Sequence, residues 1–188
     1  MSIPSMRVAA LAAAGALALV LSACAPEAEP SPEPTPTAGA APIFASDEEA
    51  LAAAVEAYEK YAAVSRAIME DGGAEAGRIE AVVSERYAPT LVAEFEAFKL
   101  AGVRSTGGSS FDGASLVDRT ESAGEAEVSI YLCRDVANVR LVDAAGLDRT
   151  PQDRKDRVPS QAFLVSSPEA PDALVVDGVE QWLGDDFC

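Results

Sequence analysis

The chain has 188 residues, with 31 Asp and Glu against 14 Lys and Arg, so its formal net charge at pH 7 is −17. This acidity disfavours nucleic acid and anionic headgroups as partners, because both require clustered Lys and Arg to replace their counterions. The chain contains no histidine, which excludes imidazole as a general base, as a metal ligand or as part of a hydrolase triad.

Residues 1–23 are typical of a secretory signal peptide. Arg7 supplies one positive charge, and residues 8–20 are an unbroken run of Ala, Leu and Val with a single glycine. As a helix, this run of 13 residues would span about 20 Å, which is shorter than the roughly 30 Å hydrocarbon core of a bilayer. The run therefore favours a cleaved targeting segment over a permanent membrane span.

The signal ends in Leu21-Ser22-Ala23-Cys24, which resembles the bacterial lipobox. Small side chains let a peptidase approach the backbone there, and a thiol is nucleophilic enough to form a thioether to diacylglycerol. The resemblance implies that Cys24 becomes the first residue of the mature protein and anchors it to the outer face of the cell membrane. The alternative is a chance cysteine in the apolar run.

The segment 24–42 is predicted to be a lipidated cysteine followed by a tether. Residues 25–42 hold six prolines, three glutamates and no large apolar side chain. Such a segment cannot bury enough surface to offset the entropy of ordering it, and proline biases it towards an extended coil. At about 3.1 Å per residue, it could hold a domain up to roughly 55 Å from its anchor.

Residues 43–188 are predicted to form one globular domain, and its first half is helical. Ser46 and Glu49 have the spacing of a capping box, and apolar residues then recur at helical spacing until Gly72. A second, shorter helix is expected around residues 76–83. Pro89 opens a third helix, for which Gly102 is the expected stop. The expected inner faces comprise Leu51, Val55, Tyr58, Ala62, Ser65, Ile68 and Met69 in the first helix, and Leu91, Phe95 and Phe98 in the third.

From Val103 the period changes to two, which indicates strands. Residues 103–111 are a weak candidate, 114–120 a plausible strand, and 125–136 and 138–143 alternate clearly. Residues 143–160 are polar and contain prolines, so they are interpreted as a long exposed connection. The stretches 161–167 and 173–184 are predicted to pair through a turn over 168–172. Helices followed by consecutive antiparallel strands predict an α+β domain with the N-terminal helices packed on one face of a curved sheet.

The cysteine count bears on the fold. If lipid consumes Cys24, two thiols remain, Cys133 and Cys188, in a protein that has left the reducing cytoplasm. We therefore predict that they form a disulfide. A reactive or metal-binding pair is the weaker alternative, because the CxxC spacing and a third ligand type are both missing.

Several stretches together carry a family resemblance: the proline-rich tether, PIFASDEEALAAAVEAYEKY, RSTGGSSFDGASL, VSIYLCRDVANVRLVDAAG and the terminal GDDFC. They resemble small actinobacterial cell-envelope lipoproteins whose domain is similar to the nuclear-transport-factor-two-like, or SnoaL-like, cone. The resemblance implies a cone-shaped domain and allows a homodimer. It implies no catalytic residue, because that cone hosts isomerases, dehydratases and assembly platforms alike.

An enzyme of this fold would need an acid facing a tyrosine in an apolar pocket. The candidate bases are Asp112 and Asp135, and the candidate hydrogen-bond donors are Tyr58, Tyr61, Tyr87 and Tyr131. With so many acidic residues, however, an acid near a tyrosine is expected by chance.

Two further polar groups were weighed as sites. Asp185-Asp186 and the loop acids Asp148, Asp153 and Asp156 suggest calcium, but the alternation of an EF-hand loop is missing. The mixed-sign run 154–157 is interpreted as a solvated hairpin tip, with a protein contact as the alternative. No metal site or cofactor is therefore expected.

The sequence as a whole predicts a lipid-anchored, extracytoplasmic binding or interaction module without chemistry of its own. Its expected partners are the membrane, through Cys24, and an envelope protein or small ligand. Two alternatives stand beside it, a small-ligand carrier that uses the cone cavity and an isomerase- or lyase-like enzyme that uses an acid–tyrosine pair.

Overall fold

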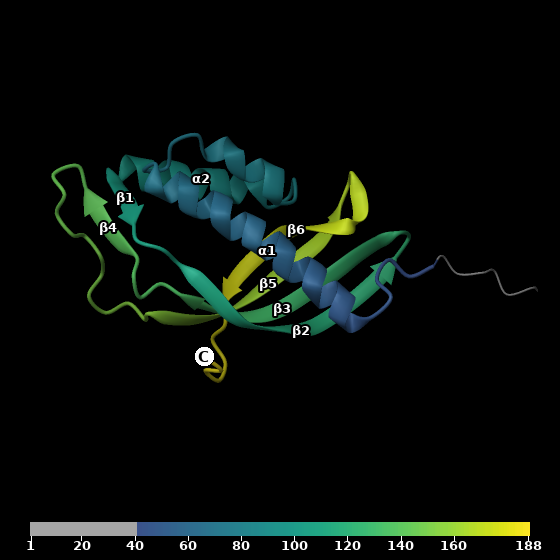
Figure 1. Ribbon diagram of the computed structural model, residues 1–188. Coiled ribbons are helices and arrows are strands. Elements are labelled where there is room, and N and C mark those ends of the chain that lie inside the picture. Colours follow the sequence, from purple (N-terminus) through teal and green to yellow (C-terminus); the bar gives the residue numbers. More distant parts are fainter. Residues whose placement is uncertain (1–40) are drawn as a thin grey trace, which may run out of the picture. The chain divides into compact units, whose positions relative to one another are not determined.

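A helix of 24 residues, α1 (Asp47–Glu70), lies along one face of an antiparallel sheet in the computed structural model of the protein (Figure 1). The structure describes residues 41–188, so the predicted signal peptide, Cys24 and nearly all of the tether lie outside the described residues. At the start of α1, the Ser46 hydroxyl accepts a hydrogen bond from the Glu49 amide, and the Glu49 carboxylate accepts one from the Ala45 amide. The predicted capping box therefore forms, with the return bond displaced by one residue.

The remaining elements follow in the predicted order of helices and then strands. They are the 3-10 helix η1 (Ala76–Val82), α2 (Ala88–Leu100), β1 (Val103–Thr106), β2 (Ser110–Ser122), β3 (Glu125–Asp135), β4 (Arg140–Asp143), β5 (Arg157–Ser167) and β6 (Ala170–Gln181). Four strands form the main antiparallel sheet in the order β2-β3-β5-β6, and β1 pairs with β4 in a separate two-stranded sheet. The described residues belong to one compact unit, so the α+β prediction is confirmed.

Three local predictions differ from the structure. The second helix is a 3-10 helix, and the β4 stretch leaves the main sheet to pair with β1. Strand β5 begins at Arg157, inside the stretch interpreted as an exposed connection. Arg157 makes two hydrogen bonds with Asp112, at 2.7 and 3.0 Å, and lies 3.8 Å from Asp135. Cross-strand charge pairing thus extends a strand that has little apolar pattern there.

The core lies between α1 and the inner face of the main sheet. Strand β3 presents Val128, Ile130 and Leu132 to it, each at most 2% exposed. From α1 the fully buried residues include Ala50 and Ala54, whereas the predicted Leu51, Val55 and Met69 are only half-buried. Small side chains let the helix axis approach the sheet closely, so the alanines occupy the centre of the contact and the larger residues flank it.

The C-terminal segment lies on the opposite face of the main sheet. Because side chains alternate along a strand, Tyr131 and Cys133 point away from α1, and Figure 1 shows the chain end on that side. The Tyr131 ring lies 4.9 Å from the Trp182 ring and 5.1 Å from the Phe187 ring. The structure joins the sulfurs of Cys133 and Cys188, whose Cα atoms are 5.6 Å apart. The geometry is thus that of the predicted disulfide.

Within residues 41–188, no helix is both long and apolar enough to cross a membrane.

Candidate functional site

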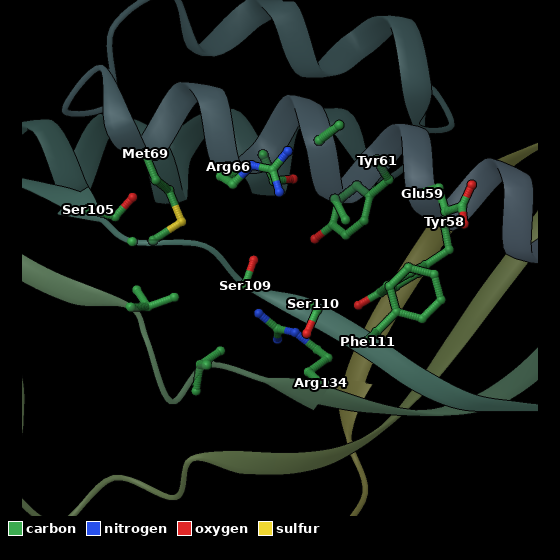
Figure 2. Close-up of a pocket in the computed structure, with 16 residues that line it drawn as sticks. Tyr58, Glu59, Tyr61, Arg66, Met69, Ser105, Ser109, Ser110, Phe111 and Arg134 are labelled. Carbon is green, nitrogen blue, oxygen red and sulfur yellow. The ribbon is translucent and has the colours of Figure 1, made fainter.

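A cavity of about 330 Å³ opens between α1 and the strands at the end where β1, the start of β2 and the end of β3 meet. Figure 2 shows the hydroxyls of Tyr58 and Tyr61 and the guanidinium of Arg134 directed into this space. The lining residues come from three parts of the chain: Tyr58, Glu59, Tyr61, Ala62, Ala63, Ser65, Arg66 and Met69 of α1; Ser105, Gly107, Ser109, Ser110 and Phe111; and Arg134, Val136 and Val139. We call this space the α1 cavity.

Helical spacing brings one wall of the α1 cavity together. Tyr58, Ala62, Ser65 and Met69 follow each other at steps of three or four residues, which places them on one face of α1. Toward its N-terminus the same helix packs against the sheet through its alanines. The packing of the N-terminal part of α1 in the core therefore also fixes the position of its C-terminal part, which lines the cavity.

The strands supply the facing wall. Arg134 follows Val128, Ile130 and Leu132 at steps of two along β3, so it belongs to the row of side chains that faces α1. It lies opposite Phe111 of β2 in the sheet register. Along the side of β3 that faces α1, the side chains are therefore buried and aliphatic up to Leu132, and the next one, Arg134, is a cation that lines the cavity.

One end of the cavity is aromatic. The rings of Tyr58 and Phe111 lie 4.8 Å apart in an edge-to-face arrangement, and those of Tyr58 and Tyr61 lie 5.6 Å apart. Burial raises the pKa of Tyr58 to about 12, although the nearby charge of Arg134 opposes the shift. Burial also raises the pKa of Tyr61. Both phenols are therefore neutral hydrogen-bonding groups at physiological pH.

The charge of the cavity is opposite in sign to that of the whole chain. Its lining contains two arginines, Arg66 and Arg134, and one carboxylate, Glu59. Neither arginine forms an ion pair with a carboxylate of residues 41–188. Both are exposed and therefore accessible to a solute that enters from water.

Hydroxyl groups complete the lining. Ser105 of β1 is only 4% exposed, Ser109 precedes β2, and Ser110 is the first residue of that strand. The Ser65 hydroxyl is enclosed near Tyr61, and no hydrogen bond of ordinary geometry reaches it from the described residues. A buried hydroxyl without a partner costs free energy, so a ligand or water that bonded to Ser65 would stabilise this arrangement.

The two candidate acids of an enzyme lie outside the α1 cavity. Asp112 and Asp135 do not line the α1 cavity, and both lie beside Arg157. The hydrogen bonds from Arg157 lower the pKa of Asp112, which is unfavourable for a general base. Tyr58 and Tyr61 line the cavity, whereas Tyr131 lies on the other face of the sheet. Neither Asp112 nor Asp135 therefore faces a tyrosine across the α1 cavity.

Three of the five acidic residues considered for calcium lie in ion pairs instead. Asp148 lies 4.0 Å from Arg140, Asp156 lies 3.7 Å from Arg154, and Asp186 lies 3.7 Å from Lys155. In the part of the chain that the structure describes, no group of three or more acidic or cysteine side chains is arranged to hold a metal ion.

A second cavity of similar volume lies over β2, β3 and β5 and shares no lining residue with the first. It carries three carboxylates, Asp118, Glu127 and Asp177, and one arginine, Arg86, which is already paired with Asp177. The second cavity is therefore negatively charged, like the chain as a whole, whereas the lining of the α1 cavity is positively charged.

Sequence reasoning did not single out Arg66 and Arg134. Their signal was present: Arg134 continues the alternating apolar row of β3, and Arg66 lies four residues after Ala62 on α1. A cation in a row that should be buried indicates either an ion pair or a site. The sequence could not decide between these, because it does not show which carboxylates lie nearby.

The buried tyrosines predict a loss of stability in alkali. Because the folded-state pKa of Tyr58 is about 12 rather than 10, its contribution is fully present below pH 10 and is lost as the pH rises through 12. The expected loss is about 1.4 kcal/mol by pH 11. Urea unfolding at pH 8 and pH 11 measures it, and Tyr58→Phe should show a smaller difference between the two. An equal difference in the variant would contradict the burial of this phenol.

No protein-family model and no curated protein matches the chain. Among solved structures, a protein from Catenulispora acidiphila is similar over 70% of this chain and 94% of its own, with 13% sequence identity and a TM-score of 0.42. A likeness this weak carries no argument about fold or function.

Proposed function

We propose that the protein is a lipid-anchored binding module of the bacterial cell envelope that takes a small molecule into the α1 cavity and has no chemistry of its own. The cavity is the observation that carries this proposal. Its volume of about 330 Å³ lies in the range of small-molecule sites, and it combines aromatic walls with a few convergent polar groups, as such sites do. Of the functions considered from sequence, the small-ligand carrier is the one that this geometry favours.

The anchor rests on the sequence Leu21-Ser22-Ala23-Cys24 and on the proline-rich stretch after it. Lipidation at Cys24 and the position on the outer face of the cell membrane are both part of the proposal. The likeness to the nuclear-transport-factor-two-like cone is a further part of it. A long helix laid on an antiparallel sheet, with a cavity between them, supports that likeness.

A neutral fluorescent probe, N-phenyl-1-naphthylamine, tests the cavity. We expect it to bind the wild-type chain with enhanced emission, and Ala62→Trp to weaken binding at least tenfold by filling the space. Ala52→Trp is the matched control, because Ala52 lies on the same helix but is exposed and outside the cavity. Equal binding to all three chains would contradict a site in the α1 cavity.

Mass spectrometry of the membrane fraction tests the anchor. The wild-type protein is expected there as a chain that begins at Cys24 and carries lipid, since two acyl chains suffice for stable anchoring. The Cys24→Ser protein is expected in the soluble fraction without lipid. Release of the same unlipidated protein from both strains would refute the anchor and leave the cavity experiment unaffected.

A further inference from the structure

We propose that the ligand of the α1 cavity is a small organic anion, with an aromatic or alicyclic body and one carboxylate, sulfonate or phosphate group held by Arg134 and Arg66. This inference rests on the proposed function and specifies the ligand class for the same cavity.

The pairing of the other cations carries the inference. Among the thirteen Lys and Arg residues between 41 and 188, nine lie in ion pairs with carboxylates. The four without such a partner in residues 41–188 are Arg66, Lys99, Arg104 and Arg134. In a chain with twice as many acids as bases, pairing is the expected state. Two of the four exceptions line one cavity of about 330 Å³.

The two guanidinium groups reach the cavity from different elements. Arg66 comes from α1, and Arg134 comes from the end of β3, so the cavity has a cation on each of its main walls. Guanidinium groups bind carboxylate, sulfonate and phosphate oxygens through paired N–H donors. The serine hydroxyls beside them, including the unpartnered Ser65, supply further hydrogen bonds to the same kind of group.

The rest of the lining indicates what carries the charge. Tyr58, Tyr61 and Phe111 form the aromatic end, and Met69 and Val139 add apolar surface elsewhere in the cavity. An inorganic anion would leave these surfaces uncovered, whereas an apolar body attached to the anionic group would cover them. Glu59, the one carboxylate of the lining, disfavours a second negative charge on the ligand.

Two probes with the same aromatic body test the inference. One is 8-anilinonaphthalene-1-sulfonate, and the other is neutral N-phenyl-1-naphthylamine, which lacks the sulfonate. We expect Arg134→Gln to weaken binding of the sulfonate about tenfold or more, and Arg66→Gln to weaken it in the same direction. Binding of the neutral probe should stay within about twofold of wild type.

Three further variants serve as controls. Arg104→Gln removes an unpaired cation outside the cavity and should leave both probes unaffected. Arg134→Lys keeps the charge and should retain most of the sulfonate affinity. Arg66 and Arg134 have no ion pair to lose within the described part of the chain, so their variants should melt close to wild type. Because they lie on separate elements, each also tests the inference if the other fails to fold.

The outcomes separate the inference from the proposed function. If Ala62→Trp blocks both probes but neither arginine variant changes sulfonate binding, the anion site is refuted and the cavity remains a ligand site. Failure of the sulfonate to bind a wild-type chain that binds the neutral probe refutes the anion site equally. If Ala62→Trp leaves both probes bound as before, the proposed function falls and the anion site with it.

Discussion

Breaking the Cys133–Cys188 bond is expected to lower the free energy of unfolding by about 4 kcal/mol. The two cysteines are separated by 55 residues, and the chain-entropy model gives about this value for a loop of that length. For a domain of this size the melting temperature should fall by roughly 10 °C or more. Cys188→Ser is the variant of choice, because Cys188 is exposed and its replacement leaves no cavity in the core.

Reduction provides the matched control. In a background of Cys24→Ser, which removes the third thiol, dithiothreitol should lower the stability of the parent chain to that of Cys188→Ser. It should leave Cys188→Ser itself unchanged. Free-thiol titration of the unreduced parent should find none. The Cys133–Cys188 pairing would be wrong if two accessible thiols were found, or if dithiothreitol did not change the stability of the parent.

The same variant should change the environment of the C-terminal segment. Trp182 is the only tryptophan, and its ring packs on Tyr131 next to the cysteine pair. Without the bond, the last residues should fray, because they are exposed and Phe187 is held mainly by its contact with Tyr131. A red shift of the tryptophan emission in Cys188→Ser, at a denaturant concentration where the core stays folded, would report this local release.

The sequence predicted the helices and the central strands because their patterns are local. The capping box at Ser46 and the alternation through Val128, Ile130 and Leu132 each need only a few neighbouring residues. The start of β5 did not follow from local pattern. Arg157 joins the sheet through Asp112 and Asp135, and this pairing spans 45 residues of sequence in the case of Asp112.

The site was harder to predict than the fold for a related reason. The sequence makes Tyr58 and Tyr61 candidates, but it pairs them with Asp112 and Asp135, because acids near tyrosines suit an isomerase. Arg66 and Arg134 combine two features: they line the cavity, and no acid of residues 41–188 lies within ion-pair distance of them. Only the folded arrangement shows both. The cavity between α1 and the strands also depends on how far the helix extends past the core, which no periodicity reveals.

A large loss of stability is also expected from a substitution just beyond the end of α1. Gly73 has a φ of +80°, and a Cβ atom there would lie 2.4 Å from the Phe95 carbonyl oxygen and 2.9 Å from the Lys99 Cβ of α2. Its amide also donates a 2.8 Å hydrogen bond to the Ile68 carbonyl, which ends the helix. Gly73→Ala therefore combines an unfavourable backbone conformation, about 1 to 2 kcal/mol, with a clash against a neighbouring helix, about 1 to 3 kcal/mol.

Gly146 allows the two costs to be separated. It has the same φ of +80°, but a Cβ atom there would meet no atom within 4 Å. Gly146→Ala should therefore lose only the conformational part of the stability, and urea unfolding of the two variants measures the clash by difference. Equal losses of unfolding free energy in the two variants would mean that α2 moves aside without a measurable loss of stability. In that case the contact between the helices would not determine where α1 ends.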